Sequence, residues 1–468
     1  MMKIELLDST LREGEQAPGV SFNVSQKLEL AKMIDNFGVE YIELGHPAVS
    51  PDVRKAVEEL SKLDLNAQKL IHGRATKGDI DDAKKYNVPW VGIFFGTSDL
   101  SLQHKFGIDR NTALMRIKEA VSYAKDLGLK LRFTAEDATR TDLDFLIEVG
   151  QLVQECGADR FSLADTVGIL TPTSTEMLVK AVVDSLDIPI HIHCHNDFGL
   201  ATANVIAAFS AGARVGDVTV NGLGERSGIA PLAEIAMITK VIHQVDNDWK
   251  LETLMDLSRK VERLSGVFNS EHKPIVGQHA FTHKAGLHTR AVLKDPRTYE
   301  AFSPEILQRD REITIDKYSG KDALKNRLQS MNIQVNETQL HEIISVIKAN
   351  PEKRKFSDID LLEITDDILD VDLKARVPIT IEAIISMELS SALYTTRITR
   401  WLMSFNQVRE VYEVAGDYDI IVHTSSGTIK ELNDLVEELR TSEGILRTFT
   451  RPILKEYSNN GTNAISVG

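Results

Sequence analysis

The sequence predicts an α/β protein: a (β/α)₈ TIM barrel, then small, mainly helical subdomains, then a second α/β domain. Three observations lead to this prediction. Eight short apolar, β-rich runs alternate with segments of helical spacing between residues 3 and 220. Each run ends in a cluster of polar residues. Near the C-terminus the order becomes strand, helix, strand, strand, helix, strand, which is typical of a ferredoxin-like domain.

The eight runs predict parallel strands, because strands that alternate with helices in this number favour a closed barrel over an open sheet. The predicted strands are Lys3–Leu7, Val39–Leu44, Lys69–Ile71, Trp90–Phe95, Lys130–Phe133, Arg160–Leu163, Ile188–Ile192 and Asp217–Val220. Helical spacing separates them, for example in Ser25–Asn36, Pro51–Leu63, Asn111–Leu127, Asp142–Cys156 and Thr173–Leu186.

The polar clusters predict where the chemistry lies. In chain order they read DSTLREGEQ, ELGHP, IHGR, FGTS, RFTAEDATR, SLADT, HIHCHND and NGLGER. In barrels of this class the active site lies at the carboxyl ends of the strands. Solvated turns alone would not place a polar cluster after every strand. The sequence therefore predicts an active site at that end of the barrel.

The chain changes character after the barrel. We expect a catalytic barrel over residues 1–270 and small helical subdomains over residues 271–350. A charged stretch suggests a linker over residues 351–377, and the ferredoxin-like domain follows over residues 378–457. A polar tail is expected over residues 458–468.

The bulk composition excludes several classes of function. The 468 residues carry a net charge of −15, which repels a phosphate backbone, so no nucleic-acid partner is expected. The two cysteines, Cys156 and Cys194, form no CxxC pair, so neither a disulfide framework nor a thiolate zinc cage is expected. No apolar run approaches the roughly 18 residues of a membrane span, so no membrane partner is expected. A cytoplasmic enzyme fits these numbers, and a local basic patch for a phosphorylated cofactor remains compatible with them.

Two histidines at the end of the seventh predicted strand are candidate metal ligands. His193 and His195 are two residues apart, and alternate strand residues face the same way, so both imidazoles point into one space. Glu13, just past the first strand, can add a carboxylate from across the barrel. Such a set leaves coordination positions open for substrate, as a catalytic metal requires. His191 shares the same face deeper in the strand, and we interpret it as a packed or supporting residue.

Other polar residues have two interpretations each. Arg12, adjacent to Glu13, either stabilises a developing alkoxide or forms an ordinary ion pair. The Gly222–Arg226 segment lacks the spacing of a dinucleotide fingerprint, so NAD is not expected. Beyond the barrel, His288 is a candidate general base near Tyr299, although a surface histidine is the commoner case.

Four motifs together resemble the isopropylmalate, citramalate and homocitrate synthase family. They are LDSTLREGEQ, SLADTVG, HCHNDFGLATAN and NGLGERSG, and the similarity extends from Lys3 to Ile333. The resemblance implies a divalent metal held by Glu13, His193 and His195. It also implies a Claisen-type condensation of acetyl-CoA with a 2-oxo acid. Mg²⁺ or Mn²⁺ is the expected ion, and Zn²⁺ or Co²⁺ is compatible with the same ligands.

Three positions resemble the homocitrate synthase branch of that family. Ile229 stands where the other branches usually carry an asparagine ligand, Arg132 where they usually carry an acidic residue, and His72 where they usually lack a histidine. Charge-assisted hydrogen bonds from Arg132, Thr134 and His72 would suit the second carboxylate of 2-oxoglutarate. Gly92 departs from the pattern, because bacterial and fungal homocitrate synthases tend to carry an aspartate there. In the fungal enzymes that aspartate is linked to lysine binding.

The resemblance also implies roles for individual residues. Arg12 is expected to stabilise the alkoxide, Thr166 to contact the C1 carboxylate, and His288 with Tyr299 to generate the acetyl-CoA enolate. In the family these last two residues come from the other subunit, so a homodimer or higher homo-oligomer is implied. The expected catalytic residues are Arg12, Glu136, His288 and Tyr299, and the expected substrate-binding residues are Arg12, Gln16, His72, Arg132, Thr134 and Thr166.

The C-terminal segment Val414–Leu454 resembles the Lrp/AsnC-type ligand-binding domain, which binds amino acids between paired subunits. We hypothesise that it binds lysine and regulates the barrel. The alternative is a plain dimerisation module.

Three other functions compete with the homocitrate synthase interpretation. The nearest is 2-isopropylmalate or citramalate synthase, which Ile229 and Arg132 disfavour. A metal-dependent lyase on the same barrel would lack the HKAGLH segment beyond it. A regulator without enzymatic activity would need a basic DNA-binding head, and an acidic barrel stands in that place.

Overall fold

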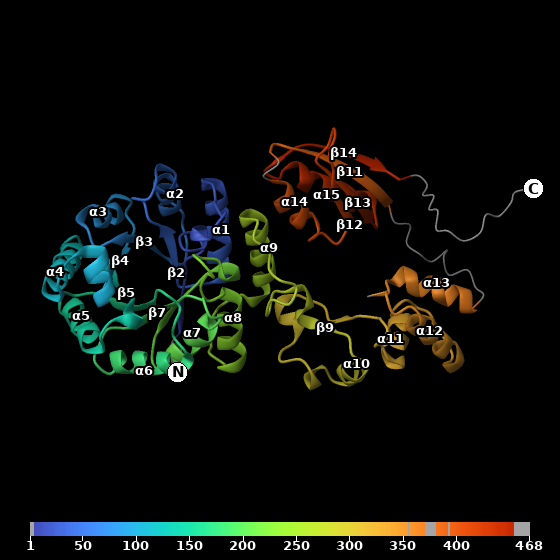
Figure 1. Ribbon diagram of the computed structural model, residues 1–468, viewed down its shortest axis with the longest axis horizontal. Coiled ribbons are helices and arrows are strands. Elements are labelled where there is room, and N and C mark those ends of the chain that lie inside the picture. The colour runs from blue at the N-terminus through green and yellow to red at the C-terminus, as the bar shows by residue number, and fades with distance from the viewer. Residues whose placement is uncertain (1–3, 354, 370–380, 392–393, 454–468) are drawn as a thin grey trace, which may run out of the picture. The chain divides into compact units, whose positions relative to one another are not determined.

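The computed structural model describes residues 4–353, 355–369, 381–391 and 394–453 (Figure 1). The chain divides into two units. The first comprises residues 1–281 and 302–310, and the second comprises residues 282–301 and 311–468.

Eight parallel strands of the first unit form a closed barrel, in which β1 pairs with β8. Figure 1 shows the helices as an outer ring around these strands. All eight predicted strands are confirmed, although the eighth begins two residues before its predicted start. The strands are β1 (Glu5–Asp8), β2 (Tyr41–Gly45), β3 (Gln68–Arg74), β4 (Trp90–Gly96), β5 (Lys130–Glu136), β6 (Arg160–Asp165), β7 (Ile190–Cys194) and β8 (Val215–Val218).

The first six helices begin at polar caps that accept hydrogen bonds from first-turn N–H groups. Asn23, Ser50, Thr76 and Asp109 cap the first four in this way. The helices are α1 (Val24–Phe37), α2 (Pro51–Ser61), α3 (Lys77–Lys85), α4 (Arg110–Asp126), α5 (Leu143–Glu155), α6 (Pro172–Val183), α7 (Ala201–Ser210), α8 (Leu232–Met237) and α9 (Leu254–Ser265). Short helical turns are η1 (Gly14–Gln16), η2 (Ser101–Phe106), η3 (Ala138–Arg140), η4 (Val220–Gly222), η5 (Ile238–Ile242), η6 (Leu251–Thr253), η7 (Gln278–Phe281) and η9 (Pro304–Leu307). Among the described residues, no helix has both the length and the apolar character that crossing a bilayer requires.

Alternation along the strands separates the helical layer from the barrel interior. In β5, Leu131, Phe133 and Ala135 belong to the apolar core. Arg132 and Thr134 take the alternate positions, which face the barrel interior. The same parity in β7 places its histidines inside. A polar residue at an inward position therefore reaches the centre of the barrel.

The second unit begins with a helical region that has its own core, in which Leu324, Ile343 and Leu361 are fully buried. The linker predicted over residues 351–377 is wrong for residues 358–369, which form α13. This helix buries Leu361 and packs on α12, so its apolar spacing outweighs the charged flank. Residues 370–377 lie outside the described residues. The elements are β9 (Thr282–His283), α10 (Gly286–Lys294), η8 (Pro296–Thr298), β10 (Glu312–Ile313), α11 (Lys321–Ser330), α12 (Glu337–Ala349) and α13 (Asp358–Leu369).

A four-stranded antiparallel sheet forms the C-terminal domain, with strand order β12-β13-β11-β14. The predicted ferredoxin-like order of elements is confirmed. The tail predicted over residues 458–468 lies outside the described residues. The elements are β11 (Ile381–Leu389), α14 (Thr395–Leu402), β12 (Val408–Glu413), β13 (Ile420–Ser426), α15 (Ile429–Arg440) and β14 (Ile445–Pro452).

Candidate active site and metal centre

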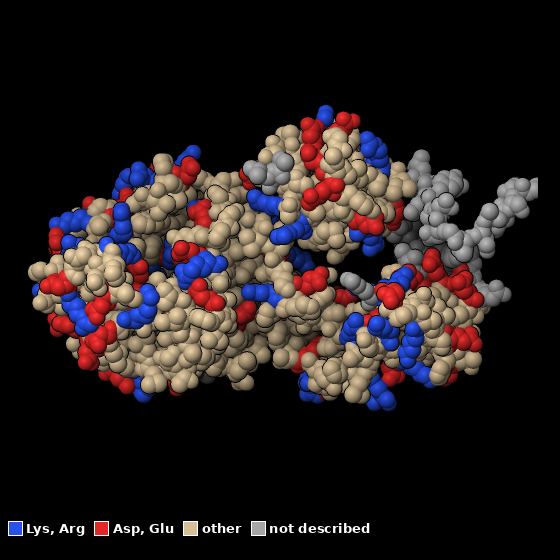
Figure 2. All heavy atoms as spheres, in the orientation of Figure 1, with Lys and Arg blue, Asp and Glu red and all other residues tan. Residues whose placement is uncertain are grey.

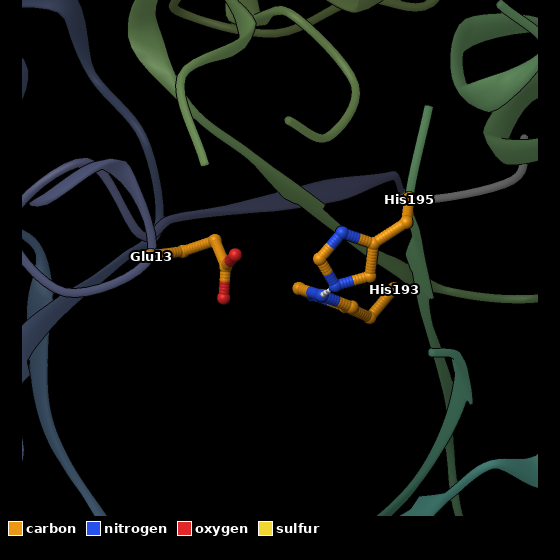
Figure 3. Close-up of side chains that lie close together, drawn as sticks. All are labelled: Glu13, His193 and His195. Atoms are coloured by element: carbon orange, nitrogen blue, oxygen red, sulfur yellow. Dashed lines mark hydrogen bonds between the residues drawn. The ribbon is translucent and has the colours of Figure 1, made fainter. Parts of the chain in front are cut away.

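Three buried side chains meet at the carboxyl end of the barrel: Glu13, His193 and His195. Figure 3 shows the Glu13 carboxylate pointing across towards the two imidazole rings. One ligand atom from each residue lies within 4.8 Å of the others, and the two Nε2 atoms are 3.3 Å apart. The shared orientation of the histidines is the one their spacing predicts. One carboxylate oxygen and two imidazole nitrogens fit a divalent cation.

Asp217 of β8 fixes the orientation of this set. Its Oδ2 atom lies 2.8 Å from Nδ1 of His193, and its Oδ1 atom lies 2.6 Å from Nε2 of His191. Burial would raise the pKa of Asp217, but His191 and the other neighbouring bases lower it, so the group is a carboxylate. With Nδ1 of His193 held, Nε2 is the nitrogen left to bind a metal. His191 is fully buried and contacts Asp217, as a packed residue would, and a supporting role for it stays a prediction.

The protonation states of Glu13 and His195 also suit a metal. Burial would raise the pKa of Glu13, but Arg12 and the two imidazoles lower it. Arg12 forms an ion pair with this carboxylate, and the backbone N–H of Glu225 donates to its Oε1 at 3.1 Å. Burial and His193 lower the pKa of His195 to about 4, which leaves that ring neutral. An ionised carboxylate and a neutral imidazole are the forms that bind metal ions.

A second buried cluster centres on Glu43 of β2. Its Oε1 accepts from Nη2 of Arg132 at 2.9 Å and lies 3.1 Å from Nδ1 of His72. Its Oε2 accepts from Nε of Arg12 at 2.7 Å and from the hydroxyl of Ser9 at 2.5 Å. Burial would raise the pKa of Glu43, but these neighbours hold it well below its usual range. Two guanidinium groups thus meet on one carboxylate, while Arg12 also pairs with Glu13 and Arg132 lies 3.7 Å from Asp217.

Arg132 and Thr134 bring unsatisfied polar atoms into the interior. Arg132 is 1% exposed, and its Nε and Nη1 atoms have no hydrogen-bond partner among the described residues, although Nη1 is 3.7 Å from Asp217. The hydroxyl of Thr134 also lacks such a partner. Buried donors without partners are costly, so they indicate a place for a polar ligand. Gly92 makes room for the guanidinium, since a Cβ there would lie 2.7 Å from Nη2 of Arg132.

His72 lies beside this cluster as a neutral ring. Burial and the adjacent Arg12 lower the pKa of His72 to about 4. Its ring stacks on Phe94, with centroids 4.9 Å apart and an interplanar angle of 9°. In the free site the charge for a charge-assisted bond to a carboxylate therefore comes from Arg132. His72 is a neutral ring there, and a neutral imidazole can still donate to an ionised carboxylate, so its role in substrate binding stays a prediction.

Three further predicted residues have different surroundings. Thr166 follows β6, and its carbonyl oxygen accepts from Nη2 of Arg226 at 2.7 Å. Gln16 lies exposed in η1. Glu136 ends β5 and forms an ion pair with Lys105 at 2.7 Å and 2.8 Å. The structure holds the backbone of Thr166 in place, whereas Glu136 is engaged elsewhere, so its catalytic role stays a prediction.

His288 and Tyr299 lie together in the second unit. His288 is on α10 and Tyr299 follows η8, and their rings stack with centroids 4.1 Å apart. Tyr299 is 46% exposed, and His288 is also exposed. Nearby, His283 lies 3.0 Å from Glu300 and is therefore already engaged. The two predicted residues form an exposed, stacked pair.

Sequence reasoning missed Glu43 and Asp217. Each is a lone acidic residue inside a buried strand, within YIELG and VGDV respectively. An isolated carboxylate at an inward position of a barrel strand is costly to bury without basic partners. That pattern was the available signal, and it would have pointed to both clusters.

Family profiles match almost the whole chain in three consecutive parts. The HMGL-like profile matches residues 3–261. A profile described as homocitrate synthase post-HMGL domain-like matches residues 275–355, and the Lrp/AsnC ligand binding domain matches residues 382–462.

Similar relatives share nearly the full length. A homocitrate synthase of Saccharolobus islandicus (strain M.14.25 / Kamchatka #1) is 45% identical over 97% of this chain and 100% of its own. Homocitrate synthases of Saccharolobus solfataricus and Sulfurisphaera tokodaii are 44% and 45% identical, each over 97% of this chain and 100% of their own.

Solved structures share the fold of the barrel. The hydroxymethylglutaryl-CoA lyase of Pseudomonas aeruginosa is 19% identical with a TM-score of 0.51, covering 63% of this chain and 98% of that one. The HMG-CoA lyase of Brucella melitensis is 16% identical with a TM-score of 0.51, covering 57% of this chain and 100% of that one. At these identities the likeness concerns the fold alone.

Proposed function

This chain belongs to the homocitrate synthase family of HMGL-like enzymes, and from that premise we propose that it is a metal-dependent homocitrate synthase. It is an enzyme of the acyl-transfer class. The proposed reaction joins the methyl carbon of acetyl-CoA to the 2-oxo carbon of 2-oxoglutarate and yields homocitrate and CoA. Under this proposal it performs the first step of lysine biosynthesis by the α-aminoadipate route.

The observation that carries the proposal is the adjacency of two buried sites. Glu13, His193 and His195 offer a donor set for a divalent cation. Arg12 bonds both Glu13 and Glu43, so this donor set lies next to the cationic cluster. A 2-oxo diacid has a matching pair of groups: a 2-oxo carboxylate that chelates metals and a distal carboxylate for a guanidinium.

The donor set fits a resident divalent cation by its chemistry. Glu13, His193 and His195 would hold the ion, and Asp217 keeps the Nε2 atom of His193 directed towards it. When bound, a divalent cation supplies Lewis-acid polarisation of the 2-oxo carbonyl group. Mg²⁺ or Mn²⁺ is the ion we propose.

The residues of the chain then supply charge and proton transfer. A base removes a proton from the acetyl methyl group, and the resulting carbon nucleophile forms a bond to the 2-oxo carbon. Arg12, whose side chain is 11% exposed, stabilises the alkoxide that forms, because a buried guanidinium is poorly screened by water. Thr166 contacts the C1 carboxylate, and Arg132 with Thr134 binds the distal one. Water then cleaves the thioester and releases CoA.

We assign the base to His288, assisted by Tyr299, acting on the active site of a second subunit. The exposure and stacking of the pair support this assignment. If each site draws on two chains, an inactive Glu13→Gln chain and an inactive His288→Ala chain should complement each other. Co-expressed chains should recover about a quarter of the activity, because half of random dimers are mixed and each has one intact site. No recovery would contradict the shared site.

The competing synthases differ at the metal site and in the pocket. An asparagine at position 229 would extend their ligand set, whereas Ile229 is fully buried and its backbone pairs with His195. An isopropyl or methyl group would need an apolar pocket, and Arg132 with its unpaired donors disfavours that.

Thiol release from acetyl-CoA tests the proposal. Purified enzyme with Mg²⁺ or Mn²⁺ would be given 2-oxoglutarate, 2-oxoisovalerate, pyruvate and oxaloacetate at equal concentration. Preference for 2-oxoglutarate that disappears in Arg132→Glu, but not in the half-exposed control Arg110→Glu, supports both the reaction and the diacid pocket. Preference for 2-oxoisovalerate or pyruvate would refute the homocitrate assignment and leave the condensation.

We further propose that lysine binds the Lrp/AsnC-type domain and inhibits the barrel. The profile match over residues 382–462 supports an effector at that domain. Lysine should then inhibit the full chain more strongly than a chain lacking residues 378–468. The shortened chain must retain its activity without lysine, as the control. Equal inhibition of both chains would contradict regulation through this domain.

A further inference from the structure

A cavity of about 500 Å³ lies at the carboxyl ends of β3 and β4, beside η2 and α4. Its lining comes from the end of β3, from β4, from η2 and from one face of α4. This volume lies within the roughly 300–1,000 Å³ range of small-molecule sites. The metal set and the Glu43 cluster do not line it.

Aromatic rings form much of the cavity wall. Phe94, Phe95 and Phe106 all line it, and Phe95 stacks on Phe106 with centroids 4.5 Å apart and an interplanar angle of 17°. The Nζ atom of Lys105 lies 5.8 Å and 5.7 Å from the ring centroids of Phe94 and Phe106. Flat apolar walls beside a cation suit a planar heteroaromatic ring.

Basic side chains surround the same cavity. Arg74, Lys77, Lys105 and Arg116 line it, against the single acidic residue Glu119. The whole chain carries a net charge of −15, and Figure 2 shows basic and acidic side chains interspersed over the visible face. Four cations around one cavity are therefore a local departure from the charge of the whole chain. Such a group favours a ligand with several negative charges.

Arg116 is the least engaged of these cations. Arg74 bonds Asp79 through two nitrogens, at 2.9 Å each, and Lys105 pairs with Glu136. Arg116 is exposed on α4 and has no hydrogen bond or ion pair within the described parts of the chain. Its guanidinium is thus available to an anionic ligand without first breaking an ion pair.

The cavity adjoins the proposed active site through one pair of rings. Phe94 lines the cavity and stacks on His72. Nδ1 of His72 is 3.1 Å from Glu43, which bonds Arg12 at 2.7 Å. Phe94 therefore forms part of the cavity wall and also contacts the Glu43 cluster through His72. A ligand that serves both places would need a flexible arm that passes from the cavity to the carboxyl end of the barrel.

We propose that this cavity binds the phosphorylated adenine nucleotide end of the acyl-CoA cosubstrate. The adenine lies against the aromatic wall, and the phosphates bind the rim cations, with Arg116 as a specificity-determining residue. The inference rests on the proposed function for its choice of cosubstrate. A free adenine nucleotide shares the same chemistry, so the experiment must separate the two sources.

Kinetics with truncated thioesters test the site. Arg116→Glu should raise KM for acetyl-CoA about ten-fold, with kcat and KM for 2-oxoglutarate unchanged. The effect should shrink for acetyl-dephospho-CoA and vanish for S-acetylpantetheine, which lacks the nucleotide. Lys118→Glu is the matched control, because Lys118 is exposed on the same helix and does not line the cavity. An equal effect on all three thioesters, or no effect on acetyl-CoA, would overturn the proposal.

A binding titration tests the cavity independently of the proposed reaction. Adenosine 3′,5′-bisphosphate should bind the full chain, compete with CoA, and bind about ten-fold more weakly to Arg116→Glu. This result does not depend on turnover, so it stands if no 2-oxo acid proves to be a substrate. Tight binding of ADP without competition from CoA would assign the cavity to a free nucleotide and overturn the cosubstrate assignment.

Discussion

Glu43 and Asp217 are both buried carboxylates on barrel strands, and each holds at least two basic side chains. Glu43 bonds Arg12 and Arg132, which are permanent cations. Asp217 instead holds His191 and His193, whose rings can be neutral. The two clusters lie close together, since Arg132 is 3.7 Å from Asp217.

In both clusters a buried carboxylate orients basic side chains, but the two clusters suit different ligands. Glu43 holds two guanidinium groups, and Arg132 keeps two buried nitrogen donors without a partner among the described residues, so its cluster is prepared for an anionic substrate. Asp217 fixes which nitrogen of His193 faces outwards, so its cluster is prepared for a metal. Removing one carboxylate should therefore change substrate binding and stability, whereas removing the other should change metal binding.

The largest effect is expected from Glu43→Gln. This change removes the carboxylate that Arg12 and Arg132 share, and the fully buried Arg132 loses its ion-pair partner at hydrogen-bond distance, so the free energy of unfolding should fall by about 3–5 kcal/mol. KM for 2-oxoglutarate should change, while metal affinity is retained. Chemical denaturation and metal titration measure the two effects. Glu5→Gln, another buried carboxylate paired with arginines, is the control that should cost stability without changing KM.

The effect of Glu43→Gln on stability should depend on pH. The folded protein holds the pKa of Glu43 below its ordinary value of 4.5, so its stabilising contribution is present above pH 4.5 and is lost as pH falls towards the folded value. The stability difference between the wild type and Glu43→Gln should therefore narrow below pH 4.5. A constant difference at all pH values would contradict the ion-pair interpretation.

His193→Ala should have the next largest effect, and it tests the Asp217 cluster rather than the Glu43 cluster. Loss of a metal ligand should lower acetyl-CoA-dependent thiol release by more than about 100-fold, beyond the range typical of supporting residues. Calorimetric titration with Mn²⁺ should show the loss of binding directly. His46→Ala is the control, since His46 pairs with Asp79 and lies outside the donor set. Retained Mn²⁺ binding would refute the assigned site.

Asp217→Asn should weaken the metal site by a smaller amount. The ligands remain, but His193 loses the carboxylate that orients it, so metal affinity should fall about 10–100-fold. Asp79→Asn is a matched control, because Asp79 also holds a histidine and an arginine at a buried position. Unchanged metal affinity in Asp217→Asn would remove the distinction between the two clusters.

Gly92→Ala should give the smallest effect and sharpen the interpretation of the Glu43 cluster. The added Cβ would lie 2.7 Å from Nη2 of Arg132, so the guanidinium must move from its bond to Glu43. KM for 2-oxoglutarate should rise about five- to ten-fold, which corresponds to roughly 1 kcal/mol. Gly78→Ala is the control, because nothing lies within 4 Å of its Cβ position. Equal kinetics for both variants would contradict a substrate role for Arg132.

Much of the architecture could be predicted because it rests on local patterns. Strand and helix periodicity placed all eight barrel strands and the C-terminal domain, and the parity of His193 and His195 predicted one shared face. Helix α13 was missed because charged residues flank it, while its apolar face is satisfied only by packing on α12. Strand alternation and helical spacing can be recognised within a short stretch of sequence. The packing of α13 on another helix cannot be recognised in that way.

The sequence by itself determined the order of elements, the metal-binding residue types and the end of the barrel where they gather. Only the tertiary structure decided how the charges pair. Glu43 and Arg132 are 89 residues apart, and no local pattern joins them. Their pairing follows from the closed parallel barrel, which brings inward side chains of separate strands into one poorly hydrated space. Each buried charge there must find a partner, and the atoms that find none mark the place of the ligand.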